Sequence, residues 1–167
     1  ICRASFRPRS LSAVFLLFCR DTLIFVIILK AENFMRRKII NNVQAILEDK
    51  ILQDCAVVIE NSKIKAITNK ISKSGDHEII NANGNYLAPG FIDLHIHGTH
   101  DKLIDKGPDD LLCICQILPR YGVTGFLPTV CPLPKGKDFD FLSKLSKVKG
   151  IGTQILGFHL EGPFLTI

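Results

Sequence analysis

The chain has 167 residues, of which 47% are hydrophobic and 22% are charged, and its formal net charge is +5. This makeup is that of an ordinary globular protein that can bury one sizeable core. Because residues 1–34 carry +3 of the charge, the remainder is nearly neutral, and the basic balance gives no reason to expect a nucleic-acid partner.

The first 34 residues differ in character from the rest. An apolar run at residues 11–29 is long enough to cross a bilayer, but Arg20 and Asp21 at its centre make insertion about break-even. Met35 is the only methionine, and the patterns of a folded domain follow it. We therefore interpret residues 1–34 as an extension that is either translated upstream sequence or a gene-model artefact. A non-catalytic, membrane-tethered binding protein anchored by this run is the minor alternative.

Short β segments follow Met35. Residues 38–47 form one apolar run, and residues 55–67 form two runs around a turn at Asn61-Ser62, which is typical of a hairpin. A further segment holds a turn at Asn83-Gly84. This pattern predicts a small N-terminal β-sandwich-type domain over residues 35–88.

From Pro89 onward the chain alternates strands and helices. We expect apolar strands at residues 91–97, 123–130 and 153–163, and helices at residues 107–122 and 138–148, the second capped by Asp138. Almost wholly apolar strands that alternate with helices indicate a buried parallel sheet. A complete barrel of this type needs about 250 residues. Residues 89–167 are therefore predicted to form the first three βα units of an incomplete TIM-like (β/α)8 barrel.

The cysteines give a separate clue to the compartment. There are six, without a CxxC pair or a framework spacing, at positions 2, 19, 55, 113, 115 and 131. Thiols without such spacing indicate reduced core residues in a cytoplasmic protein, and they favour neither a disulfide scaffold nor a cysteine zinc site.

Two histidines lie at the end of the first expected barrel strand. Side chains alternate along a strand, so His95 and His97 project to the same face and both can reach one metal ion. Neutral imidazole nitrogens bind divalent ions, and barrel enzymes place their catalytic groups at this end of the strands. Two hydrogen-bonded core histidines would show the same pattern, so the pair alone leaves both readings open.

A second histidine and a carboxylate follow in the third expected strand, where His159 and Glu161 share a face. A carboxylate at the end of an apolar strand is costly unless a cation or hydrogen-bond donors compensate it. We expect Glu161 to be a metal ligand, with a structural ion pair as the alternative. For His159 we expect a packing or supporting role beside the ligands.

Three motifs together carry a family resemblance. The stretches "APGFIDLHIHG" (88–98), "YGVTGFLPTV" (121–130) and "ILGFHLEGPFL" (155–165) resemble the amidohydrolase superfamily. The first motif is common to many of its members, including dihydroorotases. The other two narrow the resemblance to the N-acetylglucosamine-6-phosphate deacetylases, and it covers residues 36–166.

The resemblance implies a metal-dependent hydrolase of amino sugar catabolism that converts N-acetylglucosamine 6-phosphate to glucosamine 6-phosphate and acetate. Glu161 matches the family's metal-binding glutamate, and His95 and His97 match a pair that many members use for a second metal position. One or two divalent ions are implied, and His with carboxylate suits zinc, iron or manganese. The resemblance also implies a homodimer.

The match to the family pattern is incomplete. Two further histidine ligands and the catalytic aspartate that serves as general base would come from later strands, beyond Ile167, so no catalytic base is expected within this chain. After His97 a glycine-rich loop is replaced by a segment in which His100 and Asp101 are read as solvated loop residues. We expect this stretch to be inactive by itself. A dihydroorotase-like cyclic amidase is the alternative enzyme.

Overall fold

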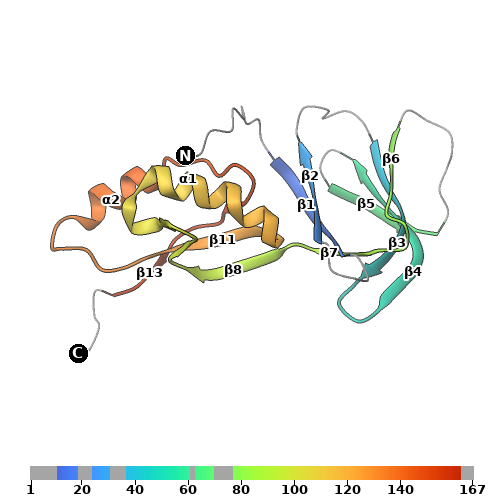
Figure 1. Ribbon diagram of the computed structural model, residues 1–167, viewed down its shortest axis with the longest axis horizontal. Helices are drawn as coiled ribbons and strands as arrows, with labels where there is room; N and C mark the ends of the chain where they lie inside the picture. Colours follow the sequence, from blue (N-terminus) through green and yellow to red (C-terminus); the bar gives the residue numbers. More distant parts are fainter. Residues whose placement is uncertain (1–10, 19–23, 31–36, 61–62, 70–76, 163–167) are drawn as a thin grey trace. The chain divides into compact units, whose positions relative to one another are not determined.

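The computed structural model describes residues 11–18, 24–30, 37–60, 63–69 and 77–162. These residues belong to two compact units, the first ending at Gly90 and the second beginning at Phe91 (Figure 1). None of the helices in the described ranges is long and apolar enough to cross a membrane.

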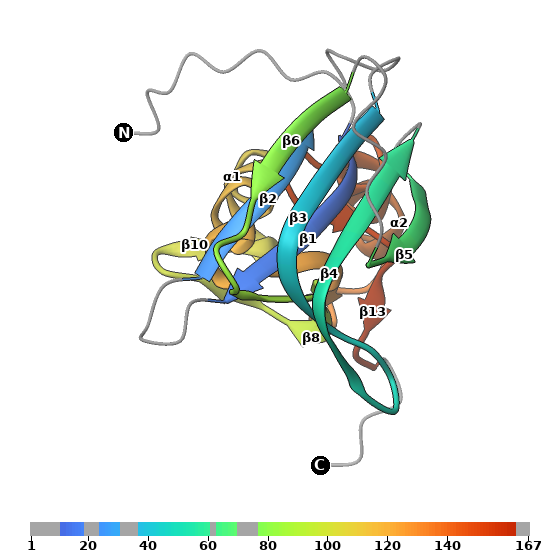
Figure 2. The same ribbon diagram turned by 90° about the vertical axis from the view of Figure 1, so that its right-hand side faces the viewer.

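The first unit is built from one hydrogen-bonded sheet of seven strands. They are β1 (Leu11–Phe18), β2 (Ile24–Lys30), β3 (Arg37–Ile46), β4 (Ile51–Glu60), β5 (Lys63–Thr68), β6 (His77–Asn81) and β7 (Tyr86–Pro89). The order is β2-β1-β7-β3-β4-β5, and β6 also pairs with β3. Figure 2 shows β3 beside β4 and β6. Strands β4 and β5 are antiparallel as the hairpin pattern predicts, although the turn residues Asn61 and Ser62 lie outside the described part.

The N-terminal extension contributes to this sheet. Strands β1 and β2 pair with each other, and β1 pairs in antiparallel fashion with β7. The sequence patterns did not lead us to expect strands here, because the apolar run looked like a single long segment. Arg20 and Asp21, which interrupt that run, lie outside the described residues.

The core of the first unit comes from the alternation of its strands. Strands β3 and β4 supply most of the buried apolar side chains, which form one cluster of Ile40, Val43, Ala45, Cys55, Val57, Ile59, Ala82 and Leu87. The intervening residues Ile39, Ala56 and Val58 are buried in a second cluster. Because successive strand residues point to opposite faces, both faces of this strand pair are covered.

The second unit is a parallel sheet with helices on one face. Its elements are β8 (Phe91–Ile96), β9 (Gly98–Thr99), β10 (Lys102–Leu103), the 3₁₀ helix η2 (Ile104–Lys106), α1 (Pro108–Ile117), the 3₁₀ helix η3 (Leu118–Tyr121), β11 (Val123–Val130), α2 (Asp138–Leu145), β12 (Gln154–Ile155) and β13 (His159–Leu160). Strand β11 pairs in parallel with β8, β12 and β13. The helices lie along one side of these strands (Figure 1).

The helices follow the expected pattern, but α1 ends at Ile117 and α2 at Leu145, short of the expected residues 122 and 148, and the expected cap of α2 is absent. Pro108 occupies the first turn of α1, and Pro119 falls in η3, where the α-helical bonding has already ended. Asp138 was expected to cap α2, but Lys137 precedes the helix without a side-chain cap. The Asp138 carboxylate instead accepts a hydrogen bond from the Leu133 backbone N–H at 3.3 Å, which draws it away from the helix amides.

The core of this unit lies between the helices and the sheet. Its buried residues come from α1, α2, β11 and the two 3₁₀ helices, and they are Ile104, Leu111, Ile114, Cys115, Leu118, Phe126, Val130 and Leu145. Leu142 of α2 and Val148, which lies beyond the end of α2, pack against them.

Two expectations about the strands of this unit were wrong. The third strand is not continuous over residues 153–163. It consists of β12 and β13 with a break around Gly157, where the lack of a side chain weakens a strand. Strand β8 was expected to be buried, yet Ile92 and Leu94 are 58% and 62% exposed, because in the described structure β8 has a single neighbour, β11.

Candidate metal centre

The two histidines of the HxH motif meet at the end of β8. His95 belongs to β8 and His97 directly follows it, and their Nε2 atoms lie 3.2 Å apart. The rings meet edge to face, with centroids 5.1 Å apart. Strand alternation therefore brings two imidazole nitrogens to one point, as the sequence predicts.

Glu161 reaches the same point from the other side of β11. Its Oε1 atom lies 3.2 Å from the Nε2 of His95 and 3.5 Å from the Nε2 of His97. The ligand atoms of the three residues all lie within 4.8 Å of one another. The structure thus groups the three residues that the sequence analysis selected as metal ligands.

The register of the parallel sheet explains this convergence. Near its C-terminal end, β11 pairs Pro128 with Ile96 on β8 and Val130 with Leu160 on β13. The Glu161 backbone N–H then donates to the Val130 carbonyl at 3.1 Å. Parallel strands that end at the same level present their following residues at one edge, which is where barrel enzymes carry their chemistry.

Two hydrogen bonds hold the end of β8 in place. The Ile96 backbone N–H donates to Oγ1 of Thr129 at 3.0 Å, and Thr129 is fully buried on β11. The His95 backbone N–H donates to the Asp93 carboxylate at 3.1 Å. These contacts fix the backbone on both sides of His95 and so limit where its ring can point.

The donor set is suited to a divalent ion. Two imidazole nitrogens and one carboxylate oxygen are the ligands found in sites for zinc and for other first-row metals, and three protein ligands leave positions open for water or substrate. The side chains of His95, His97 and Glu161 remain 50%, 40% and 31% exposed. A small molecule can therefore reach the cluster.

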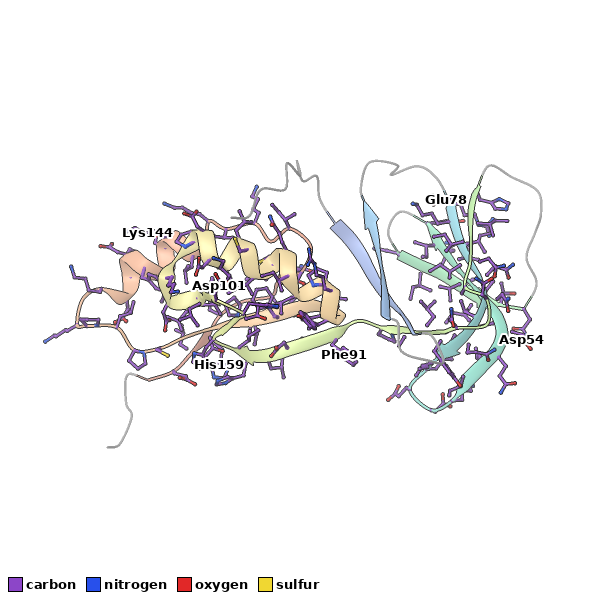
Figure 3. All side chains as sticks on the ribbon, in the orientation of Figure 1. Asp54, Glu78, Phe91, Asp101, Lys144 and His159 are labelled. Atoms are coloured by element: carbon purple, nitrogen blue, oxygen red, sulfur yellow. The ribbon has the colours of Figure 1, made fainter. Side chains whose placement is uncertain are left out.

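His159 lies beside the cluster without entering it. Its ring packs edge to face on His95 with centroids 4.7 Å apart, and its Nδ1 lies 3.2 Å from the Leu94 carbonyl oxygen, to which it can donate. Figure 3 shows His159 on the face of the sheet that is turned away from α1. This placement fits the expected supporting role.

Cys131 is the residue that sequence reasoning missed. Its Sγ lies 3.5 Å from Nδ1 of His97 and 3.9 Å from Oε2 of Glu161. Desolvation raises the pKa of the Cys131 thiol, and the carboxylates of Asp105 and Glu161 raise it further. The available signal was its position directly after β11, at the same edge of the sheet as the other three residues.

The remaining cysteines and loop residues lie elsewhere. The four described cysteines, at positions 55, 113, 115 and 131, form no disulfides with one another, while Cys2 and Cys19 lie outside the described residues. His100 is exposed and contacts Tyr121, whose hydroxyl lies 3.3 Å from its Nε2. Asp101 pairs with Lys102 at 3.2 Å. Neither His100 nor Asp101 joins the cluster.

Comparisons with known proteins show what the chain is similar to. No protein-family model matches it. The N-acetylglucosamine-6-phosphate deacetylase of Vibrio furnissii is 35% identical over 131 residues, which is 74% of this chain and 32% of the relative. The Bacillus subtilis deacetylase is 29% identical over 77% of the chain and 34% of the relative. The resemblance to the deacetylases is confirmed.

Solved structures agree with these deacetylase matches. The crystal structure of the N-acetylglucosamine-6-phosphate deacetylase from Pasteurella multocida has a TM-score of 0.68 and 26% identity, over 78% of this chain and 35% of that one. A D-hydantoinase, at 21% identity and a TM-score of 0.58, shares the fold. The chain therefore has a mixed α/β fold of the kind seen in amidohydrolase structures.

The deacetylases are not the sole matches. A dihydroorotase of Staphylococcus epidermidis is 36% identical over 95 residues, which is 53% of this chain and 20% of that enzyme. The chain spans about a third of the length of the deacetylases that it matches and about a fifth of the dihydroorotase.

Proposed function

We propose that this chain is the N-terminal part of a metal-dependent amidohydrolase that removes the acetyl group from N-acetylglucosamine 6-phosphate. The products would be glucosamine 6-phosphate and acetate. The observation that carries the proposal is the convergence of His95, His97 and Glu161, whose ligand atoms lie within 4.8 Å of one another. Matches to deacetylases over 70 to 80% of the chain support the choice of substrate class.

We assign the three residues as ligands of a divalent ion, with zinc, iron and manganese equally suited to the donor set. When bound, such an ion supplies a nucleophilic water near neutral pH and polarises a carbonyl oxygen. Glu161 would provide the charged donor, while His95 and His97 would keep their Nε2 lone pairs toward it. His159 would support the ring of His95 through the edge-to-face contact.

We also propose a domain architecture that is more detailed than the sheets described above. Residues 35–88 would form a small β-sandwich-type domain, residues 89–167 the first three βα units of a TIM-like barrel, and residues 1–34 an extension outside the family. In this arrangement the general base and two further histidine ligands come from later barrel strands, beyond Ile167. The 167-residue chain would therefore bind metal but not turn over substrate.

The remaining features follow from the same proposal. The partner would be a small amino sugar phosphate, with neither nucleic acid nor a membrane involved. The whole protein would be a cytoplasmic homodimer. The nearly neutral charge of residues 35–167 and the absence of disulfides among the four described cysteines are consistent with this assignment.

A cyclic amidase of the dihydroorotase type is a second candidate, because the Staphylococcus epidermidis dihydroorotase is 36% identical over 95 residues. The deacetylase matches extend over more of the chain, 74% and 77% against 53%. This difference favours the deacetylase.

The proposal is tested with the complete protein that contains this chain, loaded with zinc. Release of acetate from N-acetylglucosamine 6-phosphate is measured beside ring opening of dihydroorotate, and Glu161→Gln and Asp109→Asn are assayed in parallel. We expect acetate release that Glu161→Gln abolishes and that Asp109→Asn, an exposed residue of α1, leaves unchanged. Turnover of dihydroorotate without acetate release would reverse the choice between the two candidates.

A further inference from the structure

The thiol of Cys131 lies between two of the three candidate ligands. Its Sγ is 3.5 Å from Nδ1 of His97 and 3.9 Å from Oε2 of Glu161. Cys131 follows the last residue of β11, and the Val130 carbonyl accepts a hydrogen bond from the Glu161 backbone. The short link between these two backbones fixes the sulfur near the carboxylate.

The ring of His97 is oriented with its two nitrogens toward different neighbours. Its Nε2 faces the cluster, 3.2 Å from Nε2 of His95 and 3.5 Å from Oε1 of Glu161, while its Nδ1 faces the sulfur. A histidine that binds metal through one nitrogen usually donates its other N–H to a fixed acceptor, which sets the ring orientation. For His97, the sulfur of Cys131 lies at hydrogen-bond distance from Nδ1 and can be that acceptor.

The two carboxylate oxygens of Glu161 also face different neighbours. Oε1 faces the two histidines, and Oε2 faces the thiol, whose S–H can donate to it or to the Asp105 carboxylate, which also interacts with the sulfur. A thiol is a weak donor and a weak acceptor, so it can serve both groups at once. Cys131 thus contacts Nδ1 of His97 and Oε2 of Glu161, the two atoms that point away from the cluster. It leaves Nε2 of His97 and Oε1 of Glu161 free to bind a metal ion.

We propose that Cys131 is a positioning residue of the metal centre, which holds the His97 ring with Nε2 inward and the Glu161 carboxylate with Oε1 inward. The inference rests on the proposed metal site and assigns no ligand role to the sulfur. Other described thiols have different surroundings. Cys55 lies 3.5 Å from the Val43 and Leu52 carbonyls in the first unit, and Cys115 is buried among the helices.

The test measures zinc affinity of the 167-residue chain by competition with a chromophoric chelator. The variants are Cys131→Val, which removes both hydrogen bonds with an apolar side chain about one methyl group larger, Cys131→Ser, which restores a donor and acceptor, and Cys113→Ala, which removes a thiol from α1. Loss of a group that orients a ligand costs about 10- to 100-fold in metal affinity. We expect a loss of this size in Cys131→Val, recovery to within about fivefold of wild type in Cys131→Ser, and no change in Cys113→Ala.

A second readout follows the His97 ring itself. In the zinc-loaded chain, the exchange of its Nδ1–H proton with water is measured by NMR on ¹⁵N-labelled protein. A hydrogen bond to sulfur slows this exchange, so we expect it to be at least about tenfold faster in Cys131→Val. Far-ultraviolet circular dichroism checks that each variant is folded.

The outcomes separate this inference from the metal site on which it rests. If the wild-type chain does not bind zinc, both the metal site and the positioning role of Cys131 are refuted. If the wild type binds zinc and Cys131→Val binds it equally well with unchanged exchange of the His97 proton, the positioning role is refuted and the metal site stands. Equal weakening of Cys131→Val and Cys131→Ser would likewise overturn the hydrogen-bonding role, because the hydroxyl should restore it.

Discussion

Nε2 of His95 and Oε1 of Glu161 lie 3.2 Å apart, although the two residues come from strands on opposite sides of β11. The contact exists because β11 sets the register of both neighbours. It is this relationship, and not the HxH motif alone, that turns a pair of histidines into a candidate metal site.

Replacing a ligand should weaken zinc binding far more than replacing the histidine beside it. His95→Asn removes one of three donors, and we expect the zinc affinity to fall by about a hundredfold or more, close to 3 kcal/mol. His159→Asn removes an edge-to-face ring contact, worth about 0.5 to 1.5 kcal/mol, and should lower the zinc affinity by about tenfold or less. Chelator competition on the two variants measures both values. Equal losses would contradict the assignment of His159 as a supporting residue.

The core of the second unit should depend strongly on Phe126. This side chain is fully buried on β11 between the sheet and the helices, so Phe126→Ala leaves a cavity and should lower the free energy of unfolding by about 3 to 5 kcal/mol. Phe139 on α2 is 81% exposed, and Phe139→Ala should change the free energy of unfolding by less than about 0.5 kcal/mol. Urea unfolding measures the pair. Similar effects in both variants would contradict the observed packing.

A buried thiol should make stability fall at high pH. Burial raises the pKa of Cys115 to about 12 from its ordinary value of 9.0. The unfolded chain then loses this proton above pH 9 while the folded chain keeps it, so stability decreases as the pH rises from about 9 toward 12. The contribution reaches about 1.4 kcal/mol per pH unit.

This pH effect is measured by urea unfolding at several pH values for the wild type and for Cys115→Ala. Other groups also titrate in this range, but they are common to both proteins, and the difference between the two curves isolates Cys115. We expect the wild type to lose stability more steeply than the variant. Parallel curves would show that Cys115 is not protected from ionisation in the folded protein.

Gly98 should not tolerate a side chain. A Cβ atom at this position would collide with the Lys102 carbonyl oxygen, across the β9–β10 pair that directly follows His97. Gly98→Ala should therefore disturb the backbone beside His97 and weaken zinc binding by about tenfold or more. At Gly157 the same atom would meet only the Leu127 side chain at 3.4 Å, so Gly157→Ala is the matched control. Unchanged affinity in Gly98→Ala would contradict this account of the loop.

The local features of the site could be predicted from the sequence. The period of two along a strand places His95 and His97 on one side, and the compositional change at Pro89 marks where strands and helices begin to alternate. These signals depend on neighbours within a few residues. For the same reason, β11 and the start of α1 agree with the expected boundaries.

The non-local features could not be predicted in this way. The contact of Cys131 with His97 and Glu161 depends on the register of three strands, and no spacing within one segment reveals it. The break around Gly157 and the side-chain partner of Asp138 depend on what each residue meets in the folded chain. Strands β1 and β2 were missed because an apolar run with central charges carries no sign of its pairing partner.

The most direct test of the central claim is a crystal structure of the 167-residue chain grown with zinc, with anomalous data collected at the zinc absorption edge. We predict one peak with Nε2 of His95, Nε2 of His97 and an oxygen of Glu161 at about 2.0 to 2.2 Å. A zinc peak bound elsewhere, or no peak at these residues although zinc is in excess, would contradict the assignment of this cluster as a metal centre.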